Sequence, residues 1–130
     1  MAKWKPIIAV DFDGVINSYE SGWLGENTEE QLPDPPVPGA IAFLVALEQN
    51  DEVEVVIFTA RARTLKGQLA IHLWLAKYGM SSIPMITAEK PPAVVYLDDR
   101  GWCFTGTFPS LEELLAFQPW NKSGWEPKDE

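Results

Sequence analysis

Cysteine and histidine are the scarcest reactive residues of this chain, which has one of each, Cys103 and His72, in 130 residues. A single cysteine cannot form an internal disulfide, so the sequence excludes a disulfide-stapled domain and fits the reducing environment of the cytoplasm. We expect Cys103 to be a small core or strand residue rather than a reactive thiol. His72 falls inside a predicted helix, and we interpret it as a packing or surface residue.

Long apolar runs and positive charge are also lacking. No run approaches the roughly 20 residues that a membrane-spanning helix needs, so we expect no membrane contact. Lys and Arg number 10 against 19 Asp and Glu, which gives a formal net charge of −9. A surface that binds long nucleic acids through their phosphates needs the opposite sign, so a general DNA-binding role is excluded. Half of the cations nevertheless lie near predicted strand ends, where they suit a small anionic group: Arg61, Arg63, Lys66, Lys90 and Arg100.

The remaining composition, with 46% hydrophobic and 22% charged residues, is that of an ordinary globular protein. Three short apolar runs, rich in β-branched residues, predict buried parallel strands over residues 7–10, 53–59 and 93–98. Helical periodicity with start and stop signals predicts helices over Pro38–Gln49 and Thr64–Tyr78. In the second helix the apolar spacing is carried by Leu65, Leu69, Leu73 and Ala76.

The predicted elements follow the order β-α-β-α-β-β, because a weaker strand around Ile83–Ile86 precedes the last strong one. Its proline indicates an edge position. This order predicts an α/β fold with an open, mainly parallel sheet, in one domain over residues 1–118. Ser110 and Glu113 have capping-box spacing, which predicts a last short helix before a polar tail over residues 119–130. Asn17–Val37 is a long irregular segment, and such loops usually serve function or are disordered.

Two carboxylates, Asp11 and Asp13, end the apolar run in the stretch IIAVDFDGVI (residues 7–16). Buried carboxylates need partners, and like charges this close raise each other's cost of ionisation. Either the run ends in solvent or a cation lies between the acids. Ligands of open α/β sheets bind beyond the carboxyl ends of the strands. Thr59 and Arg61 fall at the carboxyl end of the second of these predicted strands, and Asp98 and Asp99 at that of the third. Lys90 directly precedes the third strand. The sequence therefore predicts a hard divalent cation held by oxygen ligands.

Four motifs in order, DFDG (11–14), FTAR (58–61), Lys90 and YLDD (96–99), resemble those of the haloacid dehalogenase superfamily of phosphohydrolases. Their order differs from that of receiver domains, in which the acid pair comes first, the phosphoacceptor in the middle and the lysine last. The similarity covers about residues 6–117, and four motifs at strand ends are far more specific than one. The resemblance implies a Rossmann-like three-layer sandwich with the strand order 5-4-1-2-3.

By this resemblance, Asp11 is the nucleophile that forms an aspartyl-phosphate. Asp13 protonates the leaving oxygen and then deprotonates the attacking water. Thr59 and Lys90 hold the non-bridging phosphoryl oxygens. Ala60 and Arg61 belong to the implied substrate-binding set, although Arg61 and Arg63 could equally cap the start of the following helix.

The resemblance also implies Mg²⁺ as cofactor, bound by Asp11, by the backbone carbonyl of Asp13 and by an acid of the Asp98/Asp99 pair. The sequence does not choose between Asp98 and Asp99. Gly14 is expected to let the backbone turn sharply beside the nucleophile.

Larger members of the superfamily insert a cap domain after the first or the second motif, and neither gap of this chain is long enough for one. We therefore expect no separate cap domain. Specificity then depends on the Asn17–Val37 loop, the Gly101–Phe108 segment, an oligomer partner or a large substrate. Tyr19 and Trp23 of the loop either stack on a substrate ring or anchor the loop to the sheet.

The function predicted by these motifs is a Mg²⁺-dependent phosphatase acting on a small phosphorylated substrate. Small cap-free members of the superfamily include nucleotide, polynucleotide-end and protein phosphatases. Two alternatives stay open: a phosphotransferase or phosphonate-cleaving relative, and a non-catalytic metal- or phosphate-binding regulatory protein. The sequence does not indicate an oligomeric state.

Overall fold

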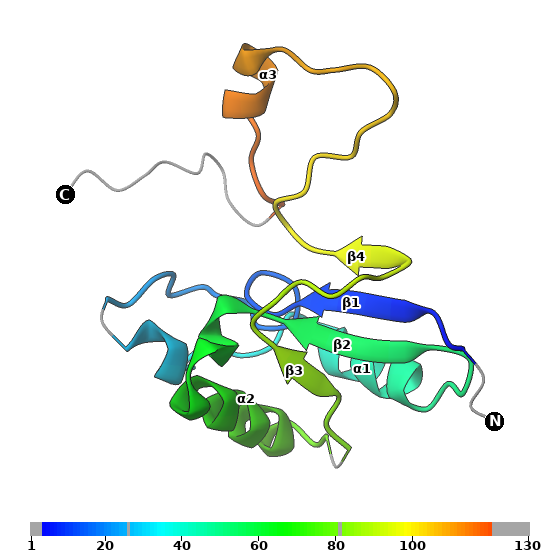
Figure 1. Cartoon of the computed structure of the whole chain (residues 1–130). Helices are drawn as coiled ribbons and strands as arrows, with labels where there is room; N and C mark the ends of the chain where they lie inside the picture. Colours follow the sequence, from blue (N-terminus) through cyan, green and yellow to red (C-terminus); the bar gives the residue numbers. More distant parts are fainter. Residues whose placement is uncertain (1–3, 26, 81, 121–130) are drawn as a thin grey trace. The chain divides into compact units, whose positions relative to one another are not determined.

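The computed structural model in Figure 1 describes residues 4–25, 27–80 and 82–120. The chain divides into two compact units, one ending at Asp98 and the other beginning at Asp99. Most of the predicted polar tail, residues 121–130, lies outside the described residues. The predicted domain boundary at residue 118 stays a prediction.

The first unit is built on a sheet of four strands that are all parallel, in the order β3-β2-β1-β4. The strands are β1 (Ile7–Asp11), β2 (Glu54–Phe58), β3 (Met85–Thr87) and β4 (Val95–Leu97). This arrangement confirms the predicted α/β fold with a mainly parallel sheet. The weak strand with the preceding proline, β3, lies at an edge of the sheet, as predicted.

Helix α1 (Ala40–Glu48) connects β1 to β2, and helix α2 (Leu65–Lys77) connects β2 to β3. Both crossovers run in the same direction along the sheet, so right-handed connections put both helices on one face (Figure 1). Residues two apart on a strand share a face. Alternate residues of β1 and β2 accordingly form one core with the helices: Ile8, Val10, Phe12, Val55, Ile57, Leu44, Ile71, Trp74 and Leu75.

The face of α2 that packs on the sheet is different from the predicted one. Leu65, Leu69 and Leu73 are 81%, 58% and 62% exposed. The buried residues of α2 are Gly67, Ile71, Trp74 and Leu75. The helix is apolar on two sides. The buried side is the one with Trp74, whose indole N–H donates a hydrogen bond to the carbonyl of Asp34 (3.1 Å).

Strand β4 corrects a second expectation. Its residues were predicted to be buried on both faces, but Val95, Tyr96 and Leu97 are 48%, 40% and 41% exposed. The physical reason is its edge position, because β1 is its one neighbour in the described sheet. Cys103 is likewise exposed, so the expected packing role for this residue is wrong.

The second unit contains helix α3 (Leu111–Leu115), which begins at the predicted capping box. The Ser110 hydroxyl accepts a hydrogen bond from the Glu113 backbone N–H (3.1 Å), and the Glu113 carboxylate accepts one from the Ser110 N–H (3.0 Å). Across the described ranges of both units, no helix has the length and apolar character that a bilayer span requires.

Candidate active site at the carboxyl ends of the strands

Asp11 and Asp98 end neighbouring strands on one face of the sheet. The last pair between β1 and β4 is Val10 with Leu97. Asp11 and Asp98 are the residues that follow this pair along the two segments. The alternation of side chains puts both on the face opposite to the helix-covered one, together with Ala9 and Tyr96. The two carboxylates predicted to bind metal therefore belong to adjacent strand ends.

Thr59 lies on the other side of Asp11, because Asp11 pairs with Phe58, the last residue of β2. Its N–H donates to the carbonyl of Thr87 (2.9 Å), and its side chain is 5% exposed. The hydroxyl oxygen accepts a hydrogen bond from the Arg61 N–H (3.3 Å), so Thr59 caps the 3₁₀ turn η2 (Ala60–Arg63). As an acceptor there, the hydroxyl keeps its own proton for another partner.

Lys90 reaches the same edge from the segment before β4. Its ammonium lies 3.6 Å from a carboxylate oxygen of Asp98. It also lies over the rings of Tyr96 and Phe58, 4.4 Å and 5.5 Å from their centroids. These contacts hold the cation on the same face as Asp11 and Asp98, while its side chain stays 52% exposed.

Asp13 is held by Arg61, a residue 48 positions along the chain. The Arg61 Nε donates to both carboxylate oxygens, each at 2.9 Å. Arg61 is 5% exposed and Asp13 27% exposed, so the ion pair is largely shielded from water. Pairing of this kind fixes the position of a carboxylate more firmly than a surface ion pair does.

Arg61 also ties the long loop to the site. Its guanidinium NH1 donates to the backbone carbonyls of Thr28 and Gln31, the latter at 3.1 Å. Thr28 belongs to the 3₁₀ turn η1 (Thr28–Glu30) in the middle of the loop. The guanidinium also lies 5.9 Å from the centroid of the Tyr19 ring. One buried cation thus joins η2, the loop and Asp13.

Asn17, the first residue of the loop, makes a second connection to Asp13. It is 1% exposed, and its amide donates to Asp13 (2.9 Å) while its carbonyl oxygen accepts from the Tyr19 N–H (3.3 Å). Tyr19 adopts a left-handed backbone conformation (φ 59°), which is strained for a residue with a large side chain. The hydrogen bond from Tyr19 to Asn17 helps to hold that conformation.

The rest of the loop is ordered by its own hydrogen bonds. Asp34 is buried and accepts from the Ser21 N–H (2.9 Å) and the Ser21 hydroxyl (2.6 Å). Trp74 of α2 donates to the Asp34 carbonyl and packs edge-on against Phe12, with centroids 5.1 Å apart. The loop is therefore an ordered part of the site, anchored on helix α2.

Gly67 allows α2 to approach Arg61 closely. A Cβ at this position would lie 1.8 Å from the Arg61 carbonyl oxygen, so the backbone would have to shift to admit a side chain. Thr64 accepts a hydrogen bond from the Gly67 N–H (3.0 Å) and so caps the helix at the same point. No local sequence pattern marks Gly67, because only the tertiary contact gives it a role.

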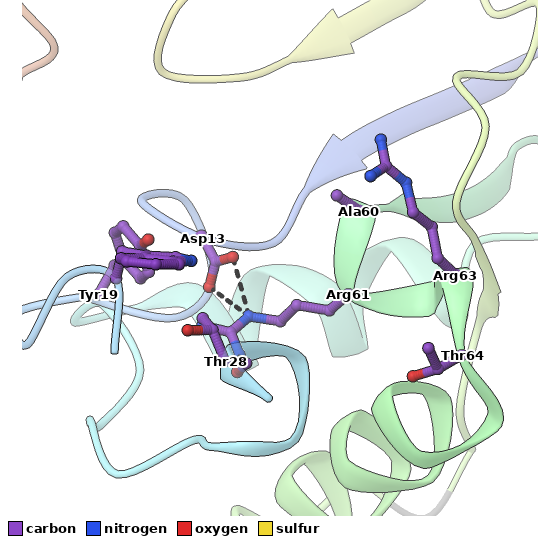
Figure 2. Close-up of a pocket in the computed structure, with 8 residues that line it drawn as sticks. Asp13, Tyr19, Thr28, Ala60, Arg61, Arg63 and Thr64 are labelled. Atoms are coloured by element: carbon purple, nitrogen blue, oxygen red, sulfur yellow. Dashed lines mark hydrogen bonds and ion pairs between the residues drawn. The ribbon is translucent and has the colours of Figure 1, made fainter. Parts of the chain in front are cut away.

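A cavity of about 450 Å³ lies beside Asp13. Its lining residues come from the turn after β1, from the loop and from η2: Asp13, Tyr19, Trp23, Thr28, Ala60, Arg61, Arg63 and Thr64. Figure 2 shows Arg61 extending to Asp13, with Tyr19 on the loop side of Asp13 and Arg63 on the η2 side. Ala60 and Arg61, predicted to bind substrate, thus both line a cavity, as do both aromatic residues of the loop.

The acids that the structure describes form no cluster of three or more His, Cys, Asp or Glu side chains that could hold a metal ion. The Asp13 carboxylate accepts hydrogen bonds from Arg61 and Asn17, and the predicted metal ligand of this residue is its backbone carbonyl. Asp99 is the first residue of the second unit. Asp11 and Asp98 remain as neighbouring carboxylates, and Mg²⁺ commonly uses one or two carboxylates with water as its other ligands. These two carboxylates are of the donor type that magnesium uses, and magnesium binding stays a prediction.

No family model, no curated protein and no solved structure matches this chain. The case for a function therefore depends on the residues and the geometry of the site.

Proposed function

We propose that this chain is a Mg²⁺-dependent phosphomonoesterase of the haloacid dehalogenase type, with Asp11 as the nucleophile. The observation that carries the proposal is the convergence of Asp11, Thr59 and Asp98 at the ends of three adjacent parallel strands, with Lys90 against Asp98. A nucleophilic carboxylate, a hydroxyl donor and a cation side by side match the needs of phosphoryl transfer, in which charge on the non-bridging oxygens must be stabilised.

The strand order supports the proposal. The order β4-β1-β2-β3 corresponds to 4-1-2-3, the portion of the expected order that four strands can form. The segments that follow β1 and β2 also support a protein without a cap domain. The Asn17–Val37 loop is tied to Arg61 and Trp74, and the gap after η2 is filled by α2.

In the proposed reaction, the Asp11 carboxylate attacks phosphorus, and Thr59 and Lys90 bind the non-bridging oxygens. Asp13 gives a proton to the leaving oxygen and later accepts one from the attacking water. Arg61 and Asn17 hold Asp13 in place for both steps. Asp11, Asp98 and the Asp13 carbonyl would hold Mg²⁺, which supplies neutralising charge between the nucleophile and an anionic substrate.

The test is hydrolysis of para-nitrophenyl phosphate, with phosphate release measured in the presence of Mg²⁺ and after chelation. We expect turnover that needs Mg²⁺ and that falls by about 10⁴-fold or more in Asp11→Asn. Asp51→Asn is the matched control, because Asp51 is exposed in the connection before β2, at the opposite end of that strand. Circular dichroism checks that each variant is folded.

Two results would contradict the proposal: normal turnover in Asp11→Asn, or no turnover by the folded wild-type protein on any phosphomonoester. Addition of an acceptor alcohol distinguishes the phosphotransferase alternative, because transfer then yields a phosphorylated alcohol in place of free phosphate.

A further inference from the structure

The cavity beside Asp13 has two lining side chains that lack partners among the described residues. Trp23 is 65% exposed and makes no ring contact with another described aromatic residue. Arg63 is exposed and has no carboxylate within ion-pair distance in the described part of the chain. A large exposed indole and an unpaired guanidinium on one cavity are features of a binding surface.

The charges that line the cavity favour an anionic ligand. Asp13 is the acidic residue of the lining. Its charge is balanced by Arg61, whose Nε lies 2.9 Å from a carboxylate oxygen of Asp13. The cation of Arg63 is left in excess, in a protein whose formal net charge is −9. A negative group is therefore attracted to the Arg63 side of the cavity.

We propose that this cavity binds the leaving group of the substrate, and that this leaving group carries a planar ring and a second phosphate. The inference rests on the proposed function, in which Asp13 faces the leaving oxygen. In that step a bond forms between an Asp11 carboxylate oxygen and phosphorus. The bond from phosphorus to the leaving oxygen breaks, and this oxygen takes the proton of the Asp13 carboxyl. Whatever is attached to the leaving oxygen then occupies the space that Asp13 lines.

The walls of that space define the chemistry of the leaving group. Trp23 offers a face on which a planar ring stacks, and Tyr19 is a second aromatic residue of the lining. Arg63 offers a fork of N–H donors that suits phosphate. The volume of about 450 Å³ is in the range of small-molecule sites and is more than one phosphate needs. A ring with a second phosphate is found both in a free nucleoside bisphosphate and at the end of a phosphorylated oligonucleotide.

The experiment compares Trp23→Ala and Arg63→Gln with Lys66→Gln. Lys66 is an exposed cation three residues beyond Arg63 and does not belong to the cavity lining. Binding is measured at equilibrium in an Asp11→Asn background, so that no turnover is needed. The probes are ribose 5-phosphate, adenosine 5′-monophosphate, adenosine 3′,5′-bisphosphate and a 5′-phosphorylated dinucleotide. KM values for the same compounds are measured with Asp11 intact.

We expect Trp23→Ala to weaken binding of the adenosine monophosphate about tenfold more than that of ribose 5-phosphate, since stacking is lost only where a base is present. Arg63→Gln should weaken binding of the bisphosphate about tenfold more than that of the monophosphate. Lys66→Gln should change neither ratio. Tighter binding of the dinucleotide than of the bisphosphate identifies a nucleic-acid end as the source of the second phosphate, and the reverse identifies a free nucleotide.

Equal losses on all probes, or an Arg63→Gln effect no larger than that of Lys66→Gln, would overturn this inference while leaving phosphatase activity untouched. Probe-specific binding without any phosphate release by the wild-type protein would instead refute the proposed function and retain the cavity as a ligand site.

Discussion

Two ion pairs stand on either side of Asp11, and they are built in opposite ways. On the β2 side, Arg61 is 5% exposed and contacts both oxygens of Asp13 at 2.9 Å. On the β4 side, Lys90 is 52% exposed and lies 3.6 Å from Asp98. Arg61 also binds two backbone carbonyls of the loop, whereas the other contacts recorded for Lys90 are with aromatic rings.

The difference in burial and in number of partners indicates different roles for the two cations: Arg61 is structural, and Lys90 is available to bind a ligand. A shielded arginine that binds several backbone and side-chain acceptors cannot change partners without unfolding its surroundings. A half-exposed lysine at a longer distance from its acid changes partners at little cost. We therefore expect the Asp13–Arg61 pair to determine the shape of the site and Lys90 to contact the substrate.

Among the variants that test this difference, Asp13→Asn is expected to have the largest effect on turnover. It removes the proposed general acid from the Asp13–Arg61 pair. Alkyl phosphates have poor leaving groups that need a proton, so their turnover should fall by about 10³-fold. Activated aryl phosphates should lose far less in the first step. The two substrates are compared in the same sample, so that any loss of folded protein cancels in the ratio. Equal losses would contradict the role of Asp13 as general acid.

Lys90→Gln tests the other pair. We expect kcat for para-nitrophenyl phosphate to fall by about 10²-fold, because a charged donor to the phosphoryl oxygens is lost. The free energy of unfolding should change by less than about 1 kcal/mol, since the ion pair is long and exposed. Steady-state kinetics and urea denaturation measure the two effects. A stable, fully active Lys90→Gln would remove Lys90 from the site.

Arg61→Gln should act mainly on stability. It leaves the Asp13 carboxylate and the loop carbonyls without their donor, so the free energy of unfolding should fall by about 3 kcal/mol. Lys90→Gln is the matched variant in the same denaturation experiment. A loss in Arg61→Gln no greater than that in Lys90→Gln would show that the two pairs do not differ as described.

Gly67→Ala is expected to have the smallest effect. In an ordinary helix this change stabilises, because glycine has the greater backbone freedom in the unfolded chain. Here the new Cβ would collide with the Arg61 carbonyl, so stability should instead fall by about 1–2 kcal/mol. Lys66→Ala, at an exposed neighbouring position of α2, is the control. Stabilisation by Gly67→Ala would mean that the close approach of α2 to Arg61 is not tight.

The sequence predicted the parts of the fold that local patterns determine. Apolar runs such as residues 53–59 predicted the strands, and the Ser110–Glu113 spacing predicted the cap of α3. The buried face of α2 was not predictable, because leucines and Trp74 make two apolar sides, and tertiary contacts determine which one packs. The exposure of β4 escaped prediction because an apolar run does not reveal whether its strand has one neighbour or two.

The candidate site divides in the same way. Asp11, Thr59 and Asp98 were predicted to lie together because parallel strands end at one edge, and that reasoning needs only the strands. Asn17 and Gly67 could not be found in this manner. Their roles depend on contacts with Asp13 and Arg61, which are brought to them by the fold. The pairing of Asp13 with Arg61 likewise joins residues 48 positions apart.

Reductive trapping tests the central claim, nucleophilic attack by Asp11, most directly. Borohydride reduces an aspartyl-phosphate to homoserine, so the folded wild-type protein is quenched with borohydride during turnover of a phosphate ester in Mg²⁺. Mass spectrometry then sequences the peptide that contains Asp11 and Asp13. The account predicts homoserine at position 11, none at position 13, and none when the substrate is omitted. Release of phosphate with homoserine at position 13, or with an unmodified position 11 in every quenched sample, would contradict it.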